Sequence, residues 1–176
     1  MFINTIARVY SAVQYVTSNM SVISQCKADL DGLVRDYDTF AHVTKHPVVV
    51  SDMYCATFAS AVGEYIVMSN NMYAMYLRGE NTDLIDAIIK HEDGHHECGH
   101  LNCSYVSLIS ASMDHELFIK REYEADEYAY MANYPMAEAL EFLRNECIGI
   151  YGKDHEICNV LAWRIDRLRT LDILPF

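Results

Sequence analysis

The chain has 176 residues, and 52% of them are apolar or aromatic, so one domain can bury a sizeable core. Its formal net charge of −12 argues against a nucleic-acid partner and against an anionic membrane surface, because both attract basic proteins. We interpret the acidity as a determinant of solubility.

The N-terminal residues do not form a secretory signal, because Asn4, Arg8, Gln14 and Thr17 interrupt their apolar positions. No stretch reaches the ~18 uninterrupted apolar residues that a membrane span requires. The six cysteines contain no C-x-x-C pair, so we expect reduced, mostly buried thiols and no cysteine zinc site. We predict a cytoplasmic protein without a membrane span.

The N-terminal quarter of the chain and the region after it differ in periodicity. Apolar positions over 3–45 recur at helical spacing and predict two helices, and Pro47 ends that region. The segments PVVVSD and GEYIVMSN are β-branched and bounded by turn residues, which predicts two strands. We therefore expect a small sheet near 47–69, with a helical part, 1–45, packed on a core that spans 46–176.

Helices are predicted in most of the remaining chain. NNMYAMYL has helical character, and Asn81 or Thr82 is expected to cap a helix from 83 to about 101. Further helices are expected around 115–132, 136–149 and 156–171. No domain boundary is visible, so the predicted fold class is α+β, with one mostly helical domain over 1–176 and a small sheet.

The stretch HEDGHHECGH, residues 91–100, contains the pattern H-E-x-x-H twice. Histidines four residues apart on a helix share a face and can bind one metal ion, and the pattern is typical of zinc peptidases. On a helical wheel of ~100° per residue, His91 and His95 point in a different direction from His96 and His100. One further ligand cannot serve both pairs, so we expect only one copy to bind a metal.

The wheel also predicts which copy faces the protein interior. Glu92 lies in the middle of the apolar face, whereas Glu97 lies among the charged residues. A general base needs a partly dry site beside the metal, so the first copy meets that need and the second does not. We expect Asp93 on the solvated side of the helix, and His96 and His100 at the surface or its boundary.

A zinc site needs another protein ligand and an open position, and the segment REYEADEYA, residues 121–129, offers the ligand. Glu122 and Asp126 share the inward face of a predicted helix with small alanines, while Glu124 lies on the opposite side. Small residues let a neighbouring helix approach closely. We predict Glu122 as the third ligand and Asp126 as the acceptor of the free ring N–H of a ligating histidine.

The run DLIDAIIKHEDGHHECGHL followed by REYEADEYA resembles the gluzincin metallopeptidases of the CAAX-prenyl-protease and HtpX type. ATFASAVGEYIVMSNNMYAM upstream, and His155 with WRIDRLRTL downstream, are similar to further segments of that family. The likeness spans about residues 53–172 and implies a zincin-like fold in which an edge strand borders the active-site helix. The chain departs from the family at Asp93, which replaces an apolar residue, and in lacking a proline after His155.

The resemblance implies that His91, His95 and Glu122 bind Zn²⁺, that Glu92 is the general base, and that Asp126 supports a ligating histidine. We predict a zinc-dependent endopeptidase for protein or peptide substrates, in which a zinc-activated water attacks the scissile carbonyl.

Three further roles are predicted around this centre. The strand containing Tyr65, Ile66 and Val67 is expected to pair with an extended substrate at the edge of the sheet. His155 is expected to stabilise the oxyanion, and Arg164 to support His155 or the substrate carbonyl.

Three alternatives stay open at this point. The first is a non-catalytic, zinc-stabilised binding or regulatory protein, although a structural site needs no base such as Glu92. The second is a soluble peptidase of the phage type that cleaves repressors, whose H-E-x-x-H and E-x-x-A core is similar. The third is a histidine-rich segment that buffers several metal ions.

Overall fold

The computed structural model describes residues 35–36, 38–51, 58–101 and 115–171. The helices predicted over 3–45 lie mostly outside these residues. Within them, the chain forms the two-residue strand β1, Arg35–Asp36, and a series of turns, so the expectation of a helix reaching residue 45 is wrong. Phe40 and Val43 from these turns are buried in the core.

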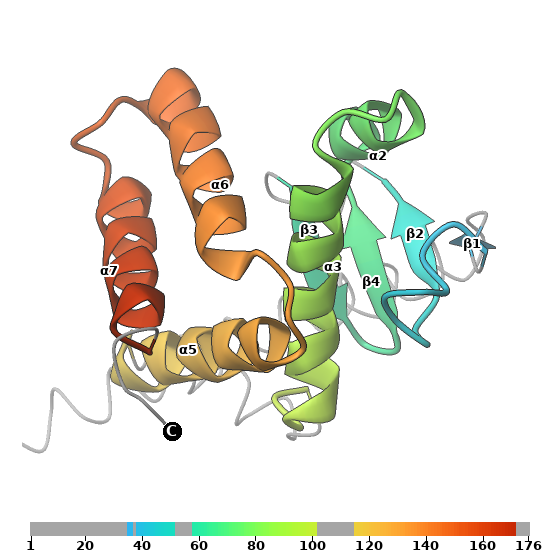
Figure 1. Cartoon of the computed structure of the whole chain (residues 1–176), viewed down its shortest axis with the longest axis horizontal. Helices are drawn as coiled ribbons and strands as arrows, with labels where there is room; N and C mark the ends of the chain where they lie inside the picture. The colour runs from blue at the N-terminus through green and yellow to red at the C-terminus, as the bar shows by residue number, and fades with distance from the viewer. Residues whose placement is uncertain (1–34, 37, 52–57, 102–114, 172–176) are drawn as a thin grey trace, which may run out of the picture.

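A four-stranded sheet lies on one side of the molecule (Figure 1). Its other strands are β2, Val48–Val50, β3, Ala59–Val62, and β4, Tyr65–Met68, in the spatial order β1-β2-β4-β3. β2 and β4 are parallel, whereas β1 and β3 pair antiparallel with their neighbours. The two predicted strands, in PVVVSD and GEYIVMSN, are confirmed, and β3 is an additional strand that the sequence reasoning missed.

β4 is an inner strand of the sheet. It pairs with β2 on one side and with β3 on the other, and all four of its side chains are buried. The predicted substrate-binding role of Tyr65, Ile66 and Val67 is therefore wrong, because an inner strand has no free edge for a peptide. β3 occupies the edge instead, joined to β4 by a tight turn in which Gly63 has φ of +60°.

The helices match their predicted positions closely. Their bounds are α2, Asn70–Leu77; α3, Thr82–Glu97; α5, His115–Met131; α6, Met136–Tyr151; and α7, Glu156–Leu171. Asn81 is the N-cap of α3, in a left-handed conformation with φ of 52°. Among the described helices, none combines the length and apolar character that a bilayer crossing requires.

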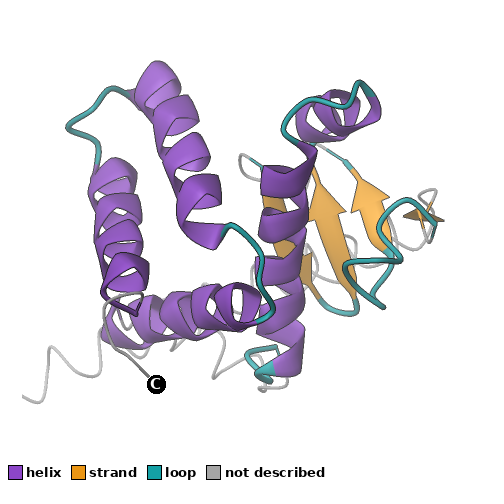
Figure 2. Cartoon of the chain, in the orientation of Figure 1, coloured by secondary structure: helices purple, strands orange, loops and turns teal. Residues whose placement is uncertain are grey.

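α3 connects the two halves of the fold (Figure 2). It packs on β3 and β4 on one side and on α5 and α6 on the other. Ile85, Ile88 and Ile89 lie in the main core, together with buried residues of the sheet and of α6 and α7. The fold is thus α+β and mostly helical, as predicted, and its central helix carries the first H-E-x-x-H.

Candidate metal centre

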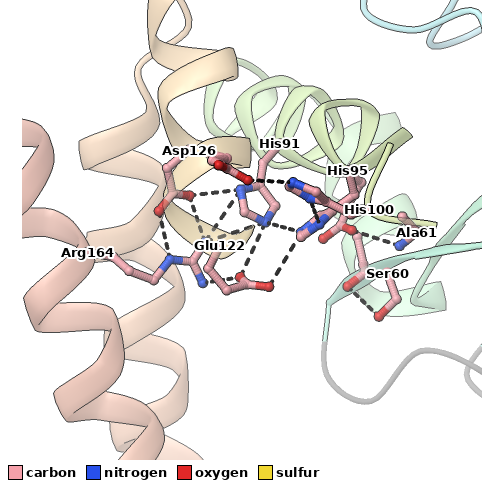
Figure 3. A network of polar contacts seen from close by, with 11 residues as sticks. Ser60, Ala61, His91, His95, His100, Glu122, Asp126 and Arg164 are labelled. Atoms are coloured by element: carbon pink, nitrogen blue, oxygen red, sulfur yellow. Dashed lines mark hydrogen bonds and ion pairs between the residues drawn. The ribbon is translucent and has the colours of Figure 1, made fainter. Parts of the chain in front are cut away.

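His91 and His95 lie on successive turns of α3 and point toward the same place (Figure 3). Their Nε2 atoms are 3.2 Å apart. Glu122 of α5 faces both rings, with Oε2 3.5 Å from Nε2 of His91 and Oε1 3.5 Å from Nε2 of His95. Two nitrogens on a tetrahedral zinc ion, at ~2.0–2.1 Å each, are about 3.3 Å apart, so the spacing of the two rings suits that ion.

The close approach of α5 to α3 depends on small residues. A methyl group at Gly94 would lie 3.1 Å from both the Cα and the carbonyl oxygen of Ala125, and equally close to the ring of Tyr128. Glycine in H-E-x-x-H and alanine three residues after Glu122 therefore allow the two helices to touch. This contact places the Glu122 carboxylate opposite the histidine pair.

A carboxylate and an arginine support His91. Its Nδ1 lies 2.8 Å from Oδ1 of Asp126, as the sequence predicted for a buried acceptor behind a ligand. Arg164 of α7 binds Asp126 through Nε at 2.8 Å and Nη2 at 2.7 Å, and its Nη1 lies 2.7 Å from Glu122. The structure thus brings Arg164 to Asp126 and Glu122 rather than to His155, one of the two partners expected for it.

Glu92 is buried beside the two histidines. Its Oε2 accepts a hydrogen bond of 2.7 Å from the backbone N–H of Ala61, on the edge strand β3. The ligand atoms of His91, Glu92 and His95 all lie within 4.8 Å of one another. Burial raises the pKa of Glu92, and the negative charge of Glu122 raises it further, although His91 opposes the shift. The group therefore holds a proton more readily than an exposed carboxylate.

The charges of the centre leave room for a cation. Three carboxylates, those of Glu92, Glu122 and Asp126, surround one guanidinium, that of Arg164. When ionised they outnumber the guanidinium by two negative charges, and buried charge is costly unless it is paired. A divalent cation between the histidines would balance this charge, so the residues present fit a zinc ion.

The pKa values of the two histidines reflect the same imbalance. Burial alone would lower the pKa of His91, but Asp126 and Glu122 outweigh it and raise the pKa to about 10. Burial lowers the pKa of His95 to about 3, with a contribution from the charge of His91. The centre therefore attracts positive charge at His91 and keeps the imidazole of His95 neutral, as metal ligation requires.

The two histidines of the second H-E-x-x-H do not converge on one position, because His96 contacts His46 and His100 contacts His95. The ring of His96 stacks on His46 at 3.9 Å and lies 3.2 Å from the carbonyl oxygen of Tyr65. Glu97 is exposed and pairs with Lys45 at 2.6 Å. Glu97 thus lies at the surface and His96 at its boundary, in agreement with the helical wheel.

His100 departs from the prediction of a surface or boundary position. α3 ends at Glu97, and Gly99, with φ of +73°, turns the chain back toward the helix. His100 is therefore buried, with its Nδ1 2.9 Å from Nδ1 of His95. The wheel failed here because it extended a regular helix past its actual end.

Asp93 also departs from the prediction of a solvated position. It is only 3% exposed and accepts a hydrogen bond of 2.6 Å from the hydroxyl of Thr44. Lys90, at 2.8 Å, and the hydroxyl of Tyr128, at 3.3 Å, complete its surroundings. Residues 44–46 and α5 cover this face of α3, which a wheel drawn for one helix cannot reveal.

A second group of side chains that could bind a metal lies on the same face of α3 as Asp93. The ligand atoms of His46, Asp93 and Glu97 are within 4.8 Å of one another. Both carboxylates already pair with a lysine, Glu97 with Lys45 and Asp93 with Lys90. These lysines supply the compensating charge, so this group does not have the unbalanced charge of the His91 centre.

The His91 centre opens into a cavity of about 790 Å³. β3 lines one side of it, and apolar side chains of α6 and α7, such as Leu143 and Val160, line another. His155 also lines the cavity but is itself exposed. Its ring stacks on Tyr151, and its Nδ1 accepts a 3.3 Å hydrogen bond from the N–H of Ile157. This contact caps α7, and the catalytic role of His155 stays a prediction.

No family model matches this chain, and no curated protein or solved structure is significantly similar to it. The resemblance to gluzincins thus rests on the sequence segments quoted above, the two motifs foremost. We infer function from the geometry and charge of the His91 centre.

Proposed function

We propose that the protein is a zinc-dependent endopeptidase whose metal is held by His91, His95 and Glu122. The observation that carries the proposal is the convergence of these three side chains with the buried carboxylate of Glu92 in one cavity. On the same basis we propose a zincin-type fold and a relationship to the gluzincins. A ligand helix, a second helix that supplies a glutamate, and a bordering edge strand support that assignment.

A bound zinc ion supplies Lewis acidity at this place and lowers the pKa of a water there. Glu92 would accept a proton from that water and pass it to the leaving amine. The Ala61 N–H fixes one carboxylate oxygen, Oε2, and leaves Oε1 for the proton. The raised pKa of Glu92 suits both halves of this transfer.

The edge strand β3 suits an extended peptide better than the strand first predicted. β3 pairs with β4 on one side, and in the described part of the chain no strand pairs with its other side. Ala59, Ser60 and Ala61 line the cavity that holds Glu92. A peptide added to this edge by main-chain hydrogen bonds would run past the metal centre.

One observation supports a different role. The carboxylate of Glu92 lies close enough to the histidine nitrogens to act as a fourth protein ligand. Four protein ligands would close the site and make it structural, as in a zinc-stabilised binding or regulatory protein. The two functions differ in what Glu92 does, so a substitution at Glu92 separates them.

The test compares the wild-type chain with Glu92→Gln, using Glu97→Gln as the matched control from the second motif. We expect one zinc per chain by elemental analysis in all three proteins. Glu92→Gln should lose peptide cleavage by about 10²–10⁴-fold, measured by mass spectrometry on a proteome-derived peptide library, while Glu97→Gln cleaves normally. Loss of zinc from Glu92→Gln would favour the structural site, and wild-type cleavage by that variant would refute the mechanism.

A further inference from the structure

His95 is supported differently from His91. Its Nδ1 does not meet a carboxylate but the Nδ1 of His100, at 2.9 Å. Nε2 of His100 in turn lies 3.0 Å from Oε2 of Glu124 on α5. The imidazole of His95 therefore contacts a second imidazole, that of His100, which in turn contacts the carboxylate of Glu124.

The positions of the hydrogen atoms on His95 and His100 depend on one another. A histidine that binds a metal through Nε2 carries its proton on Nδ1, so the Nδ1–H of His95 must find an acceptor. Nδ1 of His100 is that acceptor only when the His100 proton is on Nε2. The Nε2–H of His100 then needs an acceptor of its own, and the Glu124 carboxylate provides it.

We propose that His100 and Glu124 form a positioning relay that fixes His95 as the Nδ1–H tautomer, with its Nε2 lone pair directed at the metal position. The inference rests on the proposed zinc centre. Both residues act through His95 and do not touch substrate or metal.

Burial supports the relay. His100 is 6% exposed and lies where the chain turns back at Gly99, so its ring is held in place. Glu124 has a side chain that is 43% exposed and also lies 3.6 Å from Lys120. The charge of Glu124 thus stays near water, and the imidazole of His100 connects this carboxylate to the buried ring of His95. A carboxylate placed directly behind His95 would add another buried charge to an already acidic centre.

Two substitutions of His100 separate its two nitrogens. An asparagine oxygen can take the place of Nδ1 and accept from His95, but it cannot reach Glu124. A glutamine can take the place of Nε2 and reach Glu124, but it leaves His95 without an acceptor. The relay therefore predicts that His100→Asn preserves more of the metal site than His100→Gln.

The measurement is the zinc dissociation constant of the full chain, obtained by competition with a chromogenic chelator. We expect His100→Ala and His100→Gln to weaken zinc binding by about 10–100-fold, as changes behind a ligand do. His100→Asn should stay within a few-fold of wild type, and so should the control His96→Ala, whose ring contacts His46 and Tyr65 instead. Wild-type affinity in His100→Ala, or rescue by glutamine rather than asparagine, would overturn the relay.

A second measurement needs no metal, no turnover and no variant. Long-range ¹H–¹⁵N correlation spectra of the metal-free protein report which ring nitrogen of each histidine carries the proton. We expect Nδ1–H in His95 and Nε2–H in His100. The opposite tautomers would refute the relay even if the protein proved to be a zinc peptidase, and the expected tautomers would support it even if no peptide were cleaved.

Discussion

His91 and His95 stand one turn apart on the same helix, but the protein supports them in two ways. Behind His91, the carboxylate of Asp126 is 1% exposed and is neutralised by Arg164. Behind His95, the imidazole of His100 separates the ring from the carboxylate of Glu124, which reaches water. The comparison teaches that an acidic centre can orient two histidines while burying only one supporting carboxylate, because an imidazole can extend the second connection to the surface.

The largest effect is expected from Asp126→Asn, which removes the buried negative charge behind His91. Removing one partner of a buried ion pair costs about 3–5 kcal/mol, because the other charge stays buried without compensation. Arg164 would keep Glu122 alone, and zinc binding should weaken by roughly 10–100-fold. Denaturant unfolding of the metal-free chain checks the stability. The control is Asp166→Asn on the exposed face of α7, and a loss no larger than in this control would contradict the buried arrangement.

A smaller effect is expected from Gly94→Ala, which displaces α5 and with it both supporting carboxylates, Asp126 and Glu124. The new methyl group would meet the backbone of Ala125 at 3.1 Å, so α5 must shift away from α3. We expect a loss of about 1–3 kcal/mol in unfolding free energy, together with weaker zinc binding.

Gly149→Ala is the matched control for Gly94→Ala. Gly149 also lies inside a helix, but a methyl group there meets nothing within 4 Å. The control should therefore gain roughly 0.5–1 kcal/mol, as alanine does over glycine in a helix interior. Equal behaviour of the two variants would show that the helices do not depend on a glycine at their crossing.

The smallest effect is expected from Glu124→Ala, which removes the partly exposed carboxylate behind His100. A half-exposed carboxylate contributes little, so zinc binding should weaken by no more than about fivefold. If Glu124 acts only through His100, the loss should vanish when His100 is already alanine. A double-mutant cycle on the zinc dissociation constant measures this coupling. Additive losses would assign Glu124 a role independent of His100, and Glu127→Ala serves as the control on α5.

The sequence predicted that Asp126 lies behind one of the two histidines, without indicating which, and it missed the indirect support of His95, for a physical reason. Asp126 lies four residues after Glu122 on one helix, and a regular period determines which residues share a face. His100 lies after the end of α3, where a left-handed Gly99 replaces the helical period. Spacing along the sequence carries no information about where such a turn directs a side chain.

The sheet shows a similar division. The β-branched run of β2 and the apolar run of β4 were predictable as strands. The residues of β3, ASAV, include only one β-branched side chain, and the run is too short for its alternation to indicate a strand. Once β3 is absent from the prediction, β4 is mistaken for an edge, although its continuous burial is typical of an inner strand.

The position of Arg164 has a consequence for the newly made chain. Arg164 lies on α7, and all the other residues of the His91 centre precede it in the sequence. Translation therefore delivers the histidines and their carboxylates first and the guanidinium last. Until α7 packs against α5, Asp126 lacks the partner that compensates its charge. The centre is consequently completed only after α7 has been made, which separates the emergence of the two histidines from the moment when they are held in place.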